Sequence, residues 1–188
     1  MDSLRLLMLS LKYNFSAQRS NPVNLIVGTL GMIINNVIVL WGLWIMLFDG
    51  KPDGKNLTIY FLCLNSIVTI SWGSILFFLG GLRNLPQHVE EGTLEPMLST
   101  PRHPLFLVAI SESSTPALGD IIQGFCNLFA ICYLAGFLLA LRSFAFVFVS
   151  AIGFMGLFIL AGSIPFFLKR GNSFSQLFIE CNLSFSFY

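Results

Sequence analysis

Four long stretches without a charged residue constrain this chain more than any other feature of its sequence. They are Asn24–Phe48, Leu57–Leu82, Ile121–Leu141 and Ser143–Leu168. None contains Asp, Glu, Lys or Arg, and each ends beside a charged or turn-forming residue. A helix that crosses the hydrocarbon core of a bilayer needs about 20 apolar residues. The sequence therefore predicts an all-α integral membrane protein with about four transmembrane helices.

The overall composition agrees with a protein surrounded by lipid. Of the 188 residues, 55% are hydrophobic and only 10% are charged, whereas charged residues make up about a quarter of soluble domains. The net charge of +1 creates no long-range field that would attract nucleic acid. We therefore expect the lipid bilayer as a partner, no nucleic acid, and no soluble enzyme.

Residues 1–20 have a different pattern from the four apolar stretches. Arg5, Lys12 and Arg19 recur every seven positions, and leucines with Met8 and Phe15 follow the helical step of three and four. This pattern predicts an amphipathic helix that lies along the membrane interface. A secretory signal peptide is the alternative, but the apolar run is short and no small-residue cleavage site follows it.

The long polar segment Arg83–Pro116 separates the second and third stretches. Asn84 and Pro86 are typical of a helix start and Gly92 of a helix stop, and Thr93 can cap a second short helix that ends before Pro101. Residues 104–111 are expected to form a further segment that lies on the surface.

The distribution of Lys and Arg predicts the orientation of the spans. The N-terminus, the polar connector and the C-terminal tail, residues 169–188, lie on one side in a four-span topology, with seven basic residues against three opposite. The positive-inside rule places that side in the cytoplasm. We expect a multi-pass protein of the cell membrane, inner or plasma, whose N-terminus and connector are cytoplasmic and whose tail lies along the interface.

Several polar side chains interrupt the apolar stretches, where an unsatisfied polar group costs kilocalories. They are Asn35, Asn36, Asn65, Gln123 and Asn127. Such groups face either a partner helix, as packing contacts, or a water-filled translocation path, and the sequence leaves both interpretations open.

Asp120 and several glycines carry further expectations about the spans. Asp120 stands at the start of the third span, where an acid complements the helix dipole, and a role in proton or cation coupling is the alternative. Three glycine pairs predict close helix contacts: Gly28 with Gly31, Gly73 with Gly80, and Gly153 with Gly156.

Motifs for bound nucleotide or metal are not found in the sequence. Gly50-x-x-x-Gly54-Lys55-Asn56 has one residue too few between its glycines for a phosphate-binding loop, and lacks the Ser or Thr after the lysine. His88, with Glu90 and Glu91 nearby, lacks the second histidine four residues away that would form a metal-binding pair. We expect no directly bound cofactor, no metal and no catalytic residue, so any ATP must be hydrolysed by a partner subunit.

The connector resembles a family motif. Glu91-Gly92-x-Leu94-Glu95-x-x-Leu98-x-x-Pro101, followed by Leu118-Gly119-Asp120 and Gly124, is similar to permeases of type-2 ATP-binding-cassette exporters. The specific resemblance is to a six-span subfamily with a Gly-x-Leu-Asp-x-x-Leu-x-x-Pro connector, from which Glu95 departs.

The resemblance implies a single transmembrane permease domain over residues 1–188, with a cytoplasmic coupling helix between spans two and three. It implies that two permeases, identical or paralogous, pair over ABC-type ATPase subunits. It also implies that two further spans, present in the subfamily after the fourth, are missing here. The residues that the motif assigns to the ATPase contact are Glu91, Gly92, Leu94, Glu95, Met97, Leu98 and Pro101.

Two other functions remain alternatives to a permease. A non-transporting membrane scaffold or assembly subunit would also have four spans. A membrane-embedded enzyme would have to use His88, His103, Glu90 and Glu91.

Overall fold

The computed structural model describes residues 3–19, 22–48, 54–90, 92, 99 and 103–167. Every regular element in these ranges is a helix, which confirms the all-α fold. The elements are α1 (Ser3–Arg19), α2 (Pro22–Phe48), α3 (Gly54–Leu79), the 3₁₀ helix η1 (Gly80–Asn84), α4 (Leu85–Glu90), α6 (Pro104–Ser111), α7 (Ala117–Ala135) and α8 (Phe137–Phe167).

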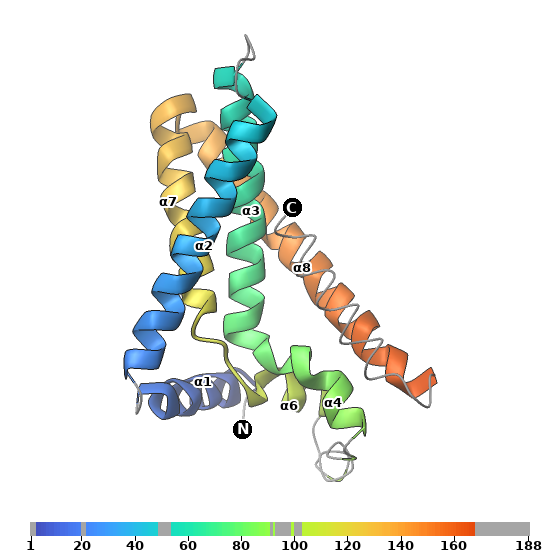
Figure 1. The fold of residues 1–188 in the computed structure, drawn as a ribbon. Coiled ribbons are helices and arrows are strands. Elements are labelled where there is room, and N and C mark those ends of the chain that lie inside the picture. Colours follow the sequence, from blue (N-terminus) through green and yellow to red (C-terminus); the bar gives the residue numbers. More distant parts are fainter. Residues whose placement is uncertain are drawn as a thin grey trace.

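Four of these helices are long and apolar enough to cross a membrane, as the sequence predicts. They are α2, α3, α7 and α8, and α3 contacts the other three (Figure 1). Outward faces of α2 and α8 carry exposed apolar side chains, among them Val27, Trp41, Phe148 and Ile152. A soluble protein would bury such faces, so their exposure fits helices that are surrounded by lipid.

The break between the third and fourth spans differs from the prediction. The sequence was interpreted as a third span through Leu141 and a fourth from Ser143, because Arg142 is charged, but α7 ends at Ala135 and α8 begins at Phe137. Gly136 has φ +97°, and its N–H bonds the Cys132 carbonyl at 3.1 Å. Only glycine adopts this backbone easily, so Gly136 ends the helix. Arg142 continues α8 and is exposed.

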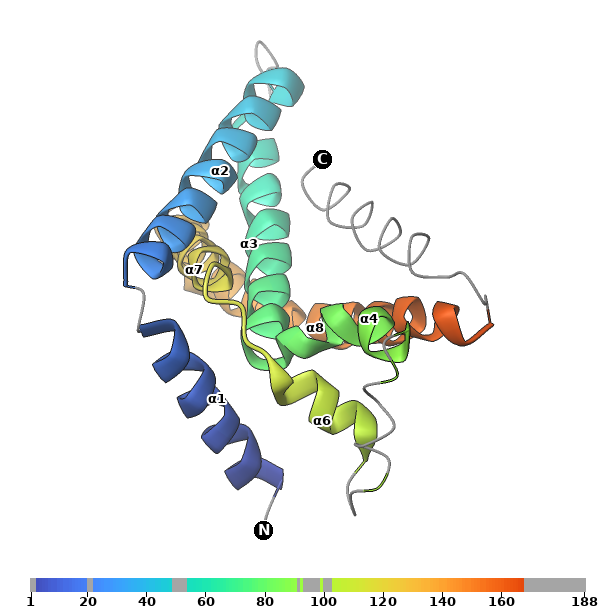
Figure 2. The same ribbon diagram turned by 60° about the horizontal axis from the view of Figure 1, so that its bottom comes forward.

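The short helices and α1 gather at one end of the spans (Figures 1 and 2). The ends of α2 and α7 and the starts of α3 and α8 lie at the other end. α1 lies across the spans rather than along them, as expected of an interface helix (Figure 1). Its Ser10 hydroxyl donates to the Ile110 carbonyl of α6, and Asn14 Nδ2 donates to Ser113 Oγ at 3.2 Å.

Helix α6 has the predicted bounds, but it does not simply lie on a surface. Pro104 is its first residue, where the missing N–H costs nothing. Val108, Ala109 and Ile110 are buried against the base of the bundle, beside η1 and α3. We call the assembly of η1, α4 and α6 the basal elbow.

The buried core is divided along α3 into two apolar clusters. The cluster nearer the basal elbow contains Trp72, Leu76, Leu82 and Phe158. The cluster nearer Gly136 contains Ile70, Ile131, Ala140 and Val147. Polar side chains lie beside these clusters, on the faces of α3 that meet α2 and α7.

Candidate functional site

Polar side chains from three spans converge inside the bundle. Asp120, Gln123 and Asn127 are spaced by three and four residues on α7, which places them on one face of that helix. All three are buried, and the face meets α2 and α3. We call the group the polar core, and its members are Asn36 of α2, Asn65 and Thr69 of α3, and Asp120, Gln123 and Asn127 of α7.

Hydrogen bonds join the polar core across the helices. Asn36 Nδ2 donates to Asp120 Oδ1 at 2.6 Å and so links α2 to α7. Asn127 Nδ2 donates to Asn65 Oδ1 at 2.7 Å and links α7 to α3. Gln123 Nε2 donates to Asn127 Oδ1 at 3.3 Å along α7. In a lipid environment such bonds satisfy groups that would otherwise be costly to bury.

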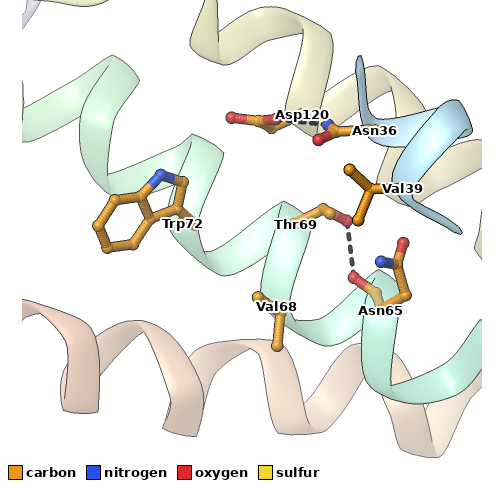
Figure 3. A pocket seen from close by; sticks show the side chains of 7 residues that line it. All are labelled: Asn36, Val39, Asn65, Val68, Thr69, Trp72 and Asp120. Carbon is orange, nitrogen blue, oxygen red and sulfur yellow. Dashed lines mark hydrogen bonds between the residues drawn. The ribbon is translucent and has the colours of Figure 1, made fainter. Parts of the chain in front are cut away.

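A small cavity lined by both polar and apolar side chains lies between α2, α3 and α7 (Figure 3). Its volume is about 30 Å³. Its lining side chains are Asn36, Val39, Asn65, Val68, Thr69, Trp72 and Asp120. None of them is basic, so the lining itself offers no positive charge to the Asp120 carboxylate.

Two buried atoms at this cavity have no hydrogen-bond partner among the described residues. They are Asp120 Oδ2 and Trp72 Nε1, whose residues are 2% and 6% exposed. Figure 3 shows the second oxygen of Asp120 directed away from Asn36, and the indole nitrogen on the ring edge that faces Asp120. The Trp72 ring packs against two phenylalanines of α8. It stacks on Phe158 with 5.1 Å between the ring centroids, and it meets Phe154 edge-on with 5.4 Å between the centroids.

The structure places the predicted polar residues as follows. Asn36, Asn65, Gln123 and Asn127 all belong to the polar core, whereas Asn35 is exposed on the outer face of α2 and does not join it. Asp120 lies in the first turn of α7, the position at which an acid complements the helix dipole. Its carboxylate also accepts the hydrogen bond from Asn36.

The sequence analysis missed Thr69 and Trp72 as members of this site. Thr69 follows Asn65 by four residues, which puts both on one face of α3. The Thr69 hydroxyl donates to the backbone carbonyl of Asn65 at 2.8 Å. That spacing is a signal that the sequence contains. Trp72 gives no such signal, because an apolar span accommodates tryptophan wherever its ring packs.

The basal elbow forms a second candidate site, because it carries the connector. A Cβ on Gly81 would lie 1.8 Å from the Val108 carbonyl oxygen, so only glycine permits η1 to approach α6 this closely. Asn84 Nδ2 donates to Glu112 Oε2 at 2.6 Å, and the Ser114 N–H donates to the Leu76 carbonyl at 3.0 Å. The two ends of the connector are therefore fixed to the lower end of α3.

The predicted ATPase contacts are described only at Gly92. Its φ is +68°, a left-handed conformation that suits a glycine following a short helix. This agrees with the expectation that Gly92 stops the helix. Glu91, Leu94, Glu95, Met97, Leu98 and Pro101 lie outside the described residues, as do residues 169–188.

The histidines do not form a metal centre within the described part of the chain. No group of three or more His, Cys, Asp or Glu side chains is arranged there to hold a metal ion. His103 is exposed at the start of α6 and His88 is half-buried in α4.

Comparison with known proteins adds the family to this geometry. The chain matches the family model described as ABC-2 family transporter protein over residues 54–187, which covers most of its length. No match was found among curated proteins or among solved structures. The matched range includes α3, the basal elbow, the connector, α7 and α8. Membrane proteins of this family work with ABC ATPase subunits. With four membrane-spanning helices, a helical connector and this match, the chain belongs to the ABC-2 family of transporter proteins.

Proposed function

We propose that this chain is the permease subunit of an ATP-driven ABC exporter, which moves its substrate out of the cytoplasm while separate subunits hydrolyse ATP. The family match over residues 54–187 is the observation that carries the proposal. The connector motif from Glu91 to Pro101 adds the contact through which the ATPase acts.

The basal elbow supports a mechanical role for the connector. Leu85 and Pro86 of α4 are almost fully buried, and Val108 of α6 is 0% exposed. Both flanking helices are thus packed into the base of the bundle, and packed interiors transmit displacement rather than absorb it. A force on the connector between them reaches α3 through η1 and reaches α8 through α4.

The proposed cycle is alternating access between an inward-open and an outward-open arrangement. Closure of two ATPase subunits on ATP displaces the connectors of two paired permeases, either two copies or two paralogues. Leu94, Met97 and Leu98 form the apolar contact with the ATPase, and Glu91 and Glu95 form its charged rim. The nucleotide bound to the ATPase subunits then determines which of the two arrangements has the lower free energy.

Co-purification of the ATPase tests the proposed docking contact. Tagged permease extracted in mild detergent should retain an ATPase with Walker motifs, whereas Leu94→Asp with Leu98→Asp should lose it, because two carboxylates cannot be buried in an apolar contact. His103→Asp is the matched control, since it adds an acid to an exposed helix-start position in the same connector. Normal membrane levels of all variants exclude an insertion defect. Equal ATPase recovery with the double variant would contradict the docking contact.

Thiol labelling separates a cycling permease from a non-transporting scaffold. Cys63 and Cys132 are half-buried in α3 and α7, and exposed Cys126 serves as the internal reference. In the permease–ATPase complex in detergent, ATP with vanadate should change the N-ethylmaleimide labelling rate of the half-buried cysteines several-fold. A scaffold leaves all three rates unchanged, even though it also binds the ATPase.

A further inference from the structure

We propose that the cavity between α2, α3 and α7 binds one small monovalent cation, with Asp120 as its charged ligand and oxygens of Asn36 and Thr69 as neutral ligands. The inference rests on the cavity and its lining, and it is independent of the ATPase contact.

No basic side chain in the cavity lining balances the charge of the Asp120 carboxylate. Asp120 is 2% exposed inside a membrane-spanning helix, and its single hydrogen bond within the described residues goes to a neutral amide. The other oxygen, Oδ2, lines a cavity without a basic side chain. A carboxylate in such a place is costly unless a positive charge accompanies it, and ionisable groups in spans commonly mark ion sites.

Neutral side-chain oxygens also line the cavity. Asn36 uses its amide N–H on Asp120, so its carbonyl oxygen keeps both lone pairs. The Thr69 hydroxyl donates its proton to the backbone carbonyl of Asn65, and its oxygen can still bind a cation. Asn65 Oδ1 accepts the bond from Asn127, two helical turns beyond Asp120 on α7, and is therefore too far away to bind the same ion. Carboxylate, amide and hydroxyl oxygens are the ligands that hard cations prefer.

The charge and the volume of the cavity determine which ligand it fits. One carboxylate among neutral groups balances one positive charge, whereas a divalent ion would leave an uncompensated charge in a low-dielectric interior. The volume of about 30 Å³ equals that of about two water-sized particles. A desolvated cation and one water fill it, and that water accepts the otherwise unpartnered Trp72 N–H.

Ion binding should stabilise the folded bundle. The ligands come from α2, α3 and α7, and the water contact reaches Trp72, whose ring packs on Phe154 and Phe158 of α8. An ion that binds only the folded arrangement stabilises it by mass action. A bound ion therefore connects all four spans.

Sodium is the probe for the test. Full-length protein purified in detergent is heated in NaCl or in N-methylglucamine chloride at equal ionic strength, and binding of ²²Na⁺ is measured in parallel. The wild type should show a Tm several degrees higher in sodium and bind one ²²Na⁺ per chain. Asp120→Asn should lose both effects, and Thr69→Val, which keeps the carboxylate and the packing, should weaken sodium binding at least several-fold. Asn35→Ala, next to Asn36 but exposed, should behave as the wild type.

Two results would overturn the proposal. A wild-type Tm that is equal in the two salts, with no bound ²²Na⁺, would mean that the cavity takes water only. Sodium effects of full size in both Asp120→Asn and Thr69→Val would mean that the ion binds elsewhere. Because Thr69→Val does not alter the charge, its result decides the matter if Asp120→Asn fails to fold.

Discussion

Asn36 and Asp120 form a buried contact between two spans of the bundle. The two side chains are 84 positions apart in sequence, yet their 2.6 Å hydrogen bond joins α2 to α7. α2 is otherwise thinly packed, with few buried side chains along its length. A hydrogen bond to a buried charged group contributes more than one between neutral groups, so a single amide holds α2 in place to a large extent.

Replacing Asn36 by Ala should therefore destabilise the protein. The change removes the donor and leaves Asp120 Oδ1 without it, which costs about 2 kcal/mol of unfolding free energy. Asn35→Ala is the matched control, because Asn35 is exposed one position away and surface changes usually stay within about 0.5 kcal/mol. Thermal unfolding of both variants in the same detergent gives the comparison. Equal Tm values for the two variants would show that the Asn36–Asp120 bond has no energetic importance.

The sequence indicated which polar residues make contacts between helices, but not which of them pair with one another. Polar residues in apolar helices predict interhelical contacts, and Gln123 and Asn127 share a face by their spacing alone. Nothing in the Asn35-Asn36 pair reveals which of the two faces inward, because the rotation of α2 is set by helices far away in sequence. The Asp120–Asn36 pairing depends on that rotation and on the relative height of two spans.

Glycines on α7 set how closely the helices approach one another. A Cβ on Gly119 would lie 2.6 Å from the Thr29 carbonyl oxygen of α2, and one on Gly124 would lie 2.3 Å from Ile70 Cγ1 of α3. Gly73 on α3 meets α7 in the same way, 2.8 Å from the Ala117 carbonyl oxygen. These close contacts bring the polar core within hydrogen-bonding distance, as small residues do at helix interfaces in membranes.

Gly119→Ala should separate α7 from α2. Its new methyl group meets a backbone oxygen that cannot rotate away, and overpacking of this kind costs about 1–3 kcal/mol. Gly153→Ala on α8 meets nothing within 4 Å, so its effect should be neutral or slightly stabilising. Fluorescence-detected size-exclusion chromatography after heating measures both. A loss with Gly153→Ala that equals the loss with Gly119→Ala would contradict the role of Gly119 as a spacer.

At the element scale the sequence predicted the spans well and their contacts less well. Hydropathy and length found four spans, proline and glycine signals found α4, and residues 104–111 were expected as a separate surface segment. Of the glycines expected at contacts, Gly73 and Gly80 lie at close contacts and Gly28 approaches Pro116, but Gly31, Gly153 and Gly156 face open space. The turn at Gly136 was missed because the nearby Arg142 is the more conspicuous signal, although a membrane-spanning helix can carry an arginine near its end.

The whole molecule has one end rich in short helices and one end with a tight turn. α1, α4 and α6 share the first end, and Gly136 lies at the second (Figure 1). From the count of basic residues, we expect the first end to lie in the cytoplasm.

Membrane sidedness can be tested with single cysteines in a chain whose four native cysteines are replaced by alanine. His103→Cys lies at the elbow end and Phe137→Cys at the turn, and both side chains are exposed. A membrane-impermeant maleimide should label Phe137→Cys in intact cells, and His103→Cys only after permeabilisation. The reverse pattern would place the N-terminus and the connector outside the cell.

The single-residue link at Gly136 also determines how α8 can move. Because one residue joins α7 to α8, their neighbouring ends stay close together, and any rotation of α8 relative to α7 is centred near Gly136. α8 has 31 residues and is therefore about 46 Å long, so a rotation of about 5° displaces its far end by roughly 4 Å. α4 contacts α8 beyond the middle of its length, on the elbow side. Because that contact lies far from Gly136, a push delivered there turns the whole of α8 about the turn, and the far end of α8 moves only somewhat further than the contact itself.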